Sequence, residues 1–152
     1  MSLSLSEFAD GWNKIMPVIG REFFRRSPNE LSQGKITLPQ LLVLDFLNEN
    51  SPCRMTDLAR FMKVSTPAMT GIIDRLVRHG YASRVYEPND RRIIKIRLTV
   101  RGTDLIAKIT RQKRDMAIDV FGRISASERQ EYLRILLRIR DILAEEKKAK
   151  AW

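Results

Sequence analysis

The sequence lacks most of the side chains from which metal sites and catalytic sites are built. It contains one histidine, His79, and one cysteine, Cys53, which are too few for a metal site of conventional ligand spacing within one chain. It contains neither a glycine-rich phosphate-binding loop nor a G-x-S-x-G nucleophile motif. We therefore expect a protein that is not an enzyme and that needs no metal ion or other cofactor.

The shortage of cysteine and of long apolar runs also constrains where the protein works. A single cysteine excludes an internal disulfide framework, which fits a reducing cytoplasm. No apolar run approaches the ~20 residues that a transmembrane helix needs, and no signal peptide is visible. Cys53 is either a redox sensor or a small buried thiol, and the second is favoured because no resolving cysteine accompanies it. The sequence therefore predicts a cytoplasmic protein without a membrane partner.

Acidic residues are scarce relative to basic ones. The 152 residues include 28 Lys and Arg but 18 Asp and Glu, so the formal net charge is +10. A surplus of this size favours a polyanionic partner, which is DNA, RNA or an anionic membrane. Many of the basic residues fall in one stretch, which includes Arg75, Arg78, His79, Arg84, Arg91, Arg92, Lys95, Arg97 and Arg101. This grouping fits phosphate contacts better than general solubility.

Residues 56–80 predict two helices joined by a tight turn. The first helix begins near Thr56, a good N-cap, and ends near Met62. Lys63 and Val64 form the turn, and we expect Val64 to be buried between the two helices. The second helix starts at Ser65 or Thr66, and its buried stripe consists of Met69, Ile72, Ile73 and Leu76. The side chains on its other face are small and polar at the N-terminal end, which suits the DNA major groove. Taken alone, an ordinary amphipathic helix with a solvated face would have the same pattern.

A two-stranded ribbon follows the helix pair. Residues 81–86 and 93–98 are rich in β-formers, and the second segment alternates apolar with basic side chains. Residues 87–92 read as the turn between them, and residues 53–55 are a candidate edge strand. Asp90 can hold an arginine side chain in one orientation, and a fixed guanidinium suits a narrow, electronegative minor groove. The alternative, a solvated basic hairpin, is less favoured because the helix pair precedes it.

The segments VSTPAMTGIIDRLVRHGY, NDRR and RLTVRG, together with the length and order of the flanking helices, resemble the MarR family of bacterial transcriptional regulators. The resemblance implies a mainly α fold with a small β-wing, in which a winged helix-turn-helix lobe binds DNA and a helical lobe dimerises. Family members often carry a basic or polar side chain where this chain has Gly71, so one base contact is missing here.

The resemblance also implies positions for the DNA contacts. The second helix of the pair would enter the major groove, with Ser65, Thr66, Ala68 and Thr70 nearest the bases and Arg75 and Arg78 on the phosphates. Arg92, oriented by Asp90, would reach the minor groove, with Arg91 on the backbone and Lys95 on the same wing.

Apolar stripes on the outer helices predict a homodimer. The first helix follows a capping box at Ser4 and runs to about Arg26, and its stripe fits core packing or a second protomer. The last helix follows a capping box at Ser125 and carries two stripes: Leu133, Leu136, Leu137 and Leu143, and Ile135, Ile139 and Ile142. One stripe suffices for its own core, so the second predicts a two-fold dimer. Residues 1–152 are then one protomer, with a winged lobe at 37–99 and a dimerisation lobe formed by 4–26 and 100–146.

The predicted function is a homodimeric regulator that binds a palindromic operator in double-stranded DNA. In this family such a protein is more often a repressor, released by a small aromatic or phenolic anion. The family's ligand pocket would have Trp12, Met16, Phe46 and Leu47 as candidate walls, although the same residues fit a core. Two other classes stay open: a winged-helix protein-interaction module without a DNA role and, more remotely, an enzyme.

Overall fold

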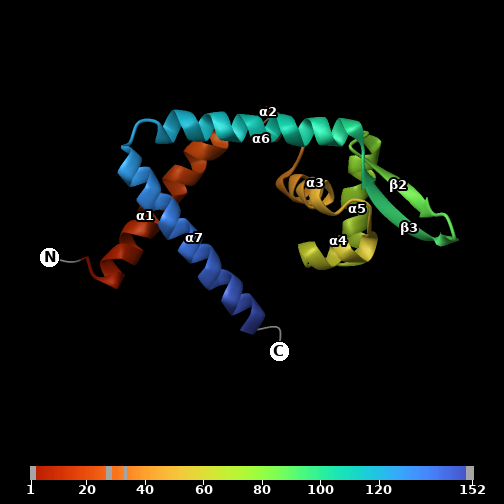
Figure 1. The fold of residues 1–152 in the computed structure, drawn as a ribbon, viewed down its shortest axis with the longest axis horizontal. Coiled ribbons are helices and arrows are strands. Elements are labelled where there is room, and N and C mark those ends of the chain that lie inside the picture. Colours follow the sequence, from red (N-terminus) through yellow and green to blue (C-terminus); the bar gives the residue numbers. More distant parts are fainter. Residues whose placement is uncertain (1–2, 27–28, 33, 150–152) are drawn as a thin grey trace. The chain divides into compact units, whose positions relative to one another are not determined.

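The computed structural model describes residues 3–26, 29–32 and 34–149, and it is mainly helical with one small sheet, as predicted. Its elements are α1 (Leu5–Arg25), α2 (Asn29–Ser32), α3 (Leu38–Asn50), β1 (Cys53–Arg54), α4 (Met55–Met62), α5 (Thr66–Arg78), β2 (Ala82–Glu87), β3 (Asp90–Leu98), α6 (Val100–Phe121) and α7 (Ala126–Ala149) (Figure 1). The chain forms two compact units, Met1–Lys113 and Arg114–Trp152, and the boundary between them lies within α6.

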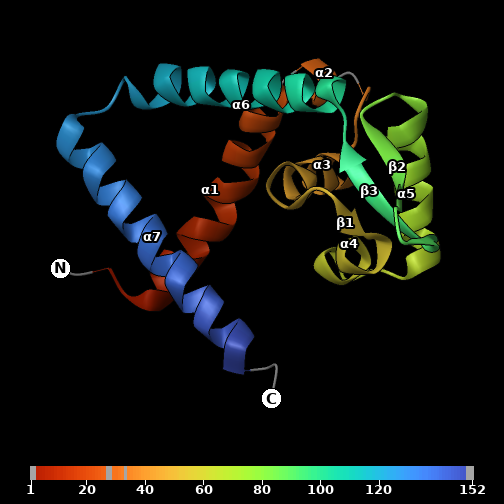
Figure 2. The same ribbon diagram turned by 45° about the vertical axis from the view of Figure 1, so that its right-hand side comes forward.

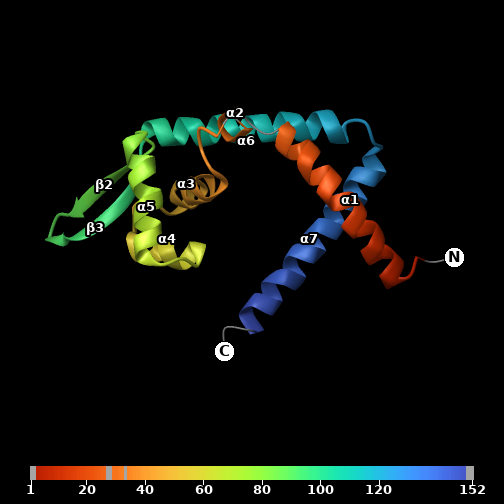
Figure 3. The same cartoon turned by 180° about the vertical axis from the view of Figure 1, so that it is seen from behind.

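The core of the first unit lies where α3, α4, α5, the sheet and the start of α6 meet. Its fully buried side chains include Leu41, Leu44, Leu47, Leu58, Met69, Ile73, Leu76, Ile96 and Ile109. In Figures 1 and 3, α5 lies between the β2–β3 hairpin on one side and α3 and α4 on the other. The core therefore holds α5 and the hairpin on one scaffold while α5 keeps one face open to solvent.

The start of α4 and the turn between α4 and α5 each differ from the prediction. α4 begins at Met55, so Thr56 is not its cap; instead Arg54 N donates to Asp57 Oδ2 at 3.2 Å. Val64 is 37% exposed, so its predicted burial is wrong. The core of the helix pair is filled by the larger Leu58 and Met69, both with 0% exposure, and Val64 is not needed there.

The three strands form an antiparallel sheet in the order β1-β3-β2. β1 confirms the edge strand expected at residues 53–55, and Cys53 pairs with Ile96. The wing, defined here as the β2–β3 hairpin, has a shorter turn than predicted, because strand pairing continues to Glu87 and resumes at Asp90. Tyr86 pairs with Ile94 whereas Glu87 pairs with Asp90, so residues 91–93 have no partner in that register. Such a bulge bends the strand and redirects its side chains.

The junction between the wing and α6 is held by Thr99. Thr99 Oγ1 donates to Gly80 O at 2.6 Å and accepts from Gly102 N at 3.0 Å. The buried face of α6 contains Gly102, Leu105, Ile106 and Ile109. Val100 is 80% exposed and lies outside this face. A helix turns 100° per residue, so Val100 lies roughly 200° away from Gly102 around the axis.

The second unit contains the last turns of α6, a short connection and α7 (Figure 2). Gly122 N donates to Ile118 O at 2.8 Å where α6 ends. Ser125 and Glu128 form the predicted capping box at the start of α7. The apolar side chains of both α7 stripes are 40 to 60% exposed, so neither stripe is buried within the second unit.

The segment before α3 also departs from the prediction. α1 has the predicted capping box at Ser4, but none of its residues is buried, so core packing does not account for its apolar stripe. The segment between α1 and α3 contains the short helix α2, in which Glu30 forms an ion pair with Lys108 of α6. Residues 27, 28 and 33 of this segment lie outside the described residues.

Candidate nucleic-acid interface

The N-terminal end of α5 presents small side chains to solvent. Ser65 is the N-cap, and its Oγ accepts from Ala68 N at 3.3 Å. Thr66, Ala68 and Gly71 are exposed on the following turns. Because the hydroxyl oxygen of Ser65 caps the helix, its own hydrogen remains available to donate to a phosphate oxygen. Small side chains at this end allow close approach of the helix to base edges.

Thr70 has a more constrained environment than its sequence position suggested. It is half-buried, and its hydroxyl donates to Thr66 O at 2.9 Å. Such bonds to the carbonyl four residues back are common for threonine in helices, so this contact was foreseeable from sequence. Thr70 Oγ1 still has a free lone pair, and it can therefore accept from an exposed amino group of adenine or cytosine.

The C-terminal end of α5 is basic. Arg75 and Arg78 are both exposed and lie in its last turn, where positive charge also interacts favourably with the helix dipole. The helix ends at Arg78, and Gly80, two residues later, adopts a φ of +76°. α5 thus has small side chains at its N-terminal end and cations at its C-terminal end.

The wing tip carries exposed arginines, but Asp90 orients them differently from the prediction. Asp90 Oδ1 accepts from the backbone N–H of Arg92 at 3.0 Å, so the expected contact with an arginine side chain is replaced by a turn contact. The aspartate side chain is short and reaches the amide two residues ahead more readily than a distant guanidinium. Asp90 therefore fixes the backbone of the bulge, while the guanidinium groups of Arg91 and Arg92 stay exposed.

Two ion pairs formed by basic residues of the wing were missed by sequence reasoning. Arg84 of β2 pairs with Asp74 of α5, and Lys95 of β3 pairs with Glu87 of β2. The sequence groups Arg84 with the basic residues that fit phosphate contacts, and it predicts a DNA contact for Lys95. The alternation of the strands places Lys95 near Glu87, which is a detectable signal, but nothing local in the sequence pairs Arg84 with Asp74.

The base of the wing also contains a stack of rings and cations. The guanidinium of Arg101 lies 5.3 Å from the centre of the Tyr81 ring. The centre of the His79 ring lies 6.1 Å from the centre of the same Tyr81 ring. A guanidinium over an aromatic ring gains electrostatic attraction from the ring face. Arg101 is thus engaged with the start of the wing.

The four candidate pocket residues occupy different environments. Trp12 and Met16 lie on the exposed stripe of α1, and the Trp12 ring lies 6.2 Å from that of Phe8. Phe46 packs on Phe61, with ring centres 4.5 Å apart, while Leu47 is fully buried in the core. Leu47 is therefore a core residue, as the second interpretation of these positions had it.

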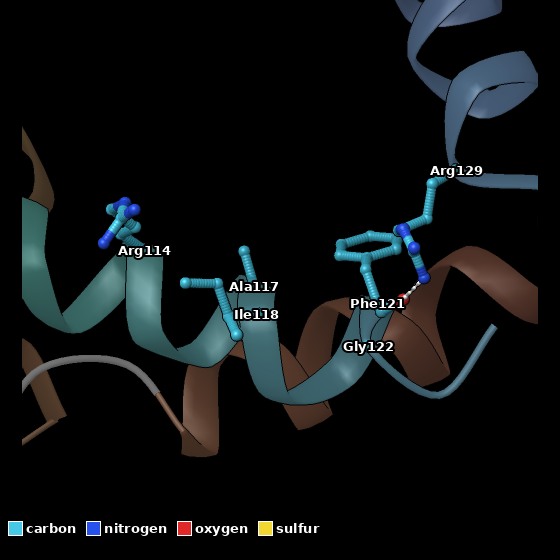
Figure 4. Close-up of a pocket in the computed structure, with 6 residues that line it drawn as sticks. All are labelled: Arg114, Ala117, Ile118, Phe121, Gly122 and Arg129. Carbon is cyan, nitrogen blue, oxygen red and sulfur yellow. Dashed lines mark hydrogen bonds between the residues drawn. The ribbon is translucent and has the colours of Figure 1, made fainter. Parts of the chain in front are cut away.

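The second unit has an open hollow of about 480 Å³ between the end of α6 and the start of α7, lined by Arg114, Ala117, Ile118, Phe121, Gly122 and Arg129 (Figure 4). Arg129 Nη1 donates to Phe121 O at 3.1 Å and also to Ile124 O. These bonds satisfy carbonyls that the end of α6 leaves without helical partners. Arg129 therefore stabilises the turn between the two helices.

Cys53 is buried in β1, and burial raises the pKa of its thiol to about 11, with Asp57 acting in the same direction. The thiolate is the reactive form.

Among the residues that the structure describes, Cys53 is the one cysteine, and no group of three or more His, Cys, Asp or Glu side chains is arranged to hold a metal ion. No helix within the described ranges is long and apolar enough to cross a membrane.

We expect Cys53 to react slowly with a thiol reagent in the folded protein. At pH 8 a thiol with a pKa of about 11 is roughly 0.1% thiolate. Labelling with a disulfide reagent should therefore be fast in urea and slow in buffer, and Cys53→Ser should keep DNA binding. Release of DNA by peroxide from the wild type but not from Cys53→Ser would contradict this expectation.

Comparison with known proteins places this arrangement in a family. The sequence profile of the MarR family matches residues 36–94. The HTH-type transcriptional regulator FarR of Neisseria gonorrhoeae is 31% identical over 116 residues, which cover 74% of this chain and 80% of FarR.

Two solved structures share the fold. A MarR family protein from Bacillus stearothermophilus superposes with a TM-score of 0.78 at 21% identity, over 93% of this chain and 99% of that one. A mutant of S. aureus MepR bound to an oligodeoxyribonucleotide gives a TM-score of 0.66 at 21% identity, over 87% and 97% of the two chains. The family consists of transcriptional regulators rather than enzymes, and this chain belongs to it: it is a DNA-binding regulator of the MarR family.

Proposed function

We propose that this protein is a homodimeric repressor that binds a two-fold symmetric operator and is released by a small ligand. The observation that carries the proposal is the placement of the recognition helix α5, with its small exposed residues, beside a wing with two exposed arginines at its tip. One element suits the major groove and the other the minor groove. The oligonucleotide complex of MepR, which has the same fold, supports this use of the scaffold.

The proposed DNA contacts divide into reading and anchoring. Thr66, Ala68 and Thr70 face the bases, and Ser65, Arg75 and Arg78 contact phosphates beside them. Arg92 enters the minor groove, with Arg91 on the backbone. Lys95 contributes less than the sequence suggested, because Glu87 already neutralises it.

The dimer is proposed from the uncovered apolar surface of the outer helices. α1 and α7 have no buried residue among those described, yet both carry continuous apolar stripes. Exposed apolar area of this extent is unfavourable in water unless another chain covers it. A two-fold dimer formed by residues 4–26 and 100–146 covers both stripes and leaves the winged lobe, residues 37–99, to contact one half-site per protomer.

The ligand is proposed to be a small aromatic anion that contacts apolar side chains of α1 and α3, with Trp12, Met16 and Phe46 as candidates. The net charge of +10 favours an anion. Such a ligand would release DNA by changing the distance between the two recognition helices, which has to match the groove spacing.

Protection mapping on the DNA upstream of the protein's own coding sequence tests the proposed function. We expect two protected half-sites related by two-fold symmetry, with centres roughly one helical turn apart. A winged helix that only contacts other proteins would leave the DNA uniformly cleaved at every protein concentration tested. Uniform cleavage on random genomic fragments as well would contradict the DNA-binding role.

We expect the wing and the recognition helix to fail in different ways when mutated. Arg92→Ala should weaken binding to all duplexes, and it should reduce the slope of log K against log salt by roughly two for a dimer, because two phosphate-region charges are lost. Thr70→Ala should cost roughly 1 kcal/mol per half-site on the cognate duplex and leave the salt slope unchanged.

Each variant is titrated on cognate and scrambled duplexes at several salt concentrations. Equal weakening of both duplexes by Thr70→Ala would show that Thr70 does not read bases. A loss confined to the cognate duplex for Arg92→Ala would show that the wing does more than anchor the protein.

A further inference from the structure

The recognition helix carries an acidic side chain on the stripe that is proposed to read DNA. Asp74 follows Thr66 and Thr70 at intervals of four residues, so the three side chains lie along one side of α5. The Asp74 side chain is 48% exposed. A carboxylate at this place repels phosphate groups unless a cation neutralises it. The identity of its partner therefore matters for DNA binding.

Arg84 of β2 supplies that cation. Its Nη2 donates to Asp74 Oδ1, and its side chain is 31% exposed. The contact joins the recognition helix to the wing directly, and these are the two elements proposed to enter different grooves. A charge-assisted hydrogen bond has a narrow preferred geometry, so it limits how far the helix and the wing can move apart.

The same contact leaves one arginine fewer to bind phosphate groups. Arg84 and Lys95 of the wing are both paired with carboxylates. Within the described part of the chain, Arg91, Arg92 and Arg97 form no ion pair of this kind. Of the basic side chains of the wing, these three arginines are therefore the ones left to contact phosphate groups.

We infer that Asp74 is a specificity-determining residue, which acts by holding Arg84. This inference rests on the proposed DNA-binding function. A phosphate contact adds affinity for any sequence and carries no base information. When Asp74 holds Arg84, random DNA gains no contact from that arginine. The same bond keeps the helix and the wing at one spacing, which the cognate site requires and random DNA does not.

The inference is tested with three variants and one control. Asp74→Asn frees Arg84, Arg84→Met leaves the Asp74 carboxylate without its partner but keeps an apolar stem, and the double variant removes both charges. Asp141→Asn is the matched control, because Asp141 is an exposed aspartate paired with Arg140 on α7, and its replacement adds the same charge. Binding is measured by fluorescence anisotropy at several salt concentrations. The probes are a scrambled duplex and the duplex that the wild type most enriches from a random pool.

For Asp74→Asn we expect tighter binding to the scrambled duplex, on the order of ten-fold, with a salt slope steeper by about 1.8, since a dimer gains two phosphate contacts. Affinity for the enriched duplex should rise less, so the ratio of the two affinities falls. Arg84→Met should weaken binding to both duplexes. The double variant should recover the wild-type salt slope, because the intact pair contributes no net charge to the interface.

The rival explanation is that Arg84 contacts a phosphate in the wild-type complex. In that case the double variant would have a salt slope shallower than the wild type by about 1.8, which would overturn the inference. An unchanged affinity ratio in Asp74→Asn, or an equal change in Asp141→Asn, would also overturn it. An exposed ion pair adds little stability, so all variants should melt close to the wild type; if Asp74→Asn alone fails to fold, Arg84→Met and the double variant still decide.

The outcomes separate this inference from the proposed function. A wild-type protein that shows no salt-dependent affinity for either duplex would contradict the proposed function itself. A wild type that prefers its enriched duplex, together with an Asp74→Asn variant of unchanged preference, would overturn the role of Asp74 alone.

Discussion

Gly102→Ala should destabilise the folded protein by roughly 3 kcal/mol or more, which places it at the upper end of overpacking effects. A Cβ atom at this position would lie 2.2 Å from Tyr81 O and 2.7 Å from Leu98 Cδ1. Tyr81 O cannot withdraw easily, because it accepts from Thr99 N at 3.2 Å. The start of α6 would therefore have to move away from the wing. Thermal unfolding should show a melting temperature lower by roughly 6 to 12 °C.

The control for this experiment is Gly71→Ala. A Cβ at Gly71 meets nothing within 4 Å, and the residue is exposed within α5. Alanine has the higher helix propensity, so this change should raise stability by about 0.5 to 1 kcal/mol. If Gly102→Ala melts at the wild-type temperature, the close contact between α6 and the wing is not required by the fold.

Leu136→Asp should convert the proposed dimer into a monomer and thereby abolish tight operator binding. Leu136 is 42% exposed in the protomer and lies beside the stacked rings of Phe121 and Tyr132, whose centres are 5.4 Å apart. In a two-fold interface the change buries two unpaired carboxylates, and each costs several kcal/mol. A monomer binds one half-site without the second half-site linked to it. Operator affinity should therefore fall by far more than it does when a single DNA contact is removed. The molar mass measured by light scattering should fall from about twice 17.7 kDa to 17.7 kDa.

Gln130→Asp is the matched control on the same helix. Gln130 is an exposed polar residue in the first turns of α7, and the change adds the same negative charge without replacing an apolar side chain. It should leave the dimer and its operator affinity intact. A Leu136→Asp protein that is still dimeric, or a wild type that is monomeric at micromolar concentration, would show that α7 does not form the interface.

Local chemistry was predictable wherever one side chain contacts backbone a few residues away. The caps at Ser4, Ser65 and Ser125 follow from single residues and their spacing. The strand positions follow from the alternation of apolar and basic side chains. These features depend on at most four consecutive residues, so one sequence suffices to identify them.

Features that depend on tertiary placement were not predictable. Asp74 and Arg84 meet because the core fixes α5 against β2, and no spacing rule links a helix position to a strand position. The bulge at residues 91–93 depends on strand register, which the turn composition did not reveal. The stripe of α1 has the same pattern whether it faces a core or a second chain, so its exposure in the protomer became visible only in the structure.

The dependence of DNA affinity on salt concentration shows whether the charge surplus of +10 serves to bind DNA. We propose that the recognition helices and the wing tips of a dimer use this charge on phosphate groups. A dimer that neutralises about eight phosphates should show log K falling with log salt at a slope of roughly −7 on B-form DNA. A slope near zero, with or without residual binding, would show that the basic surface is not used on DNA and would contradict the account.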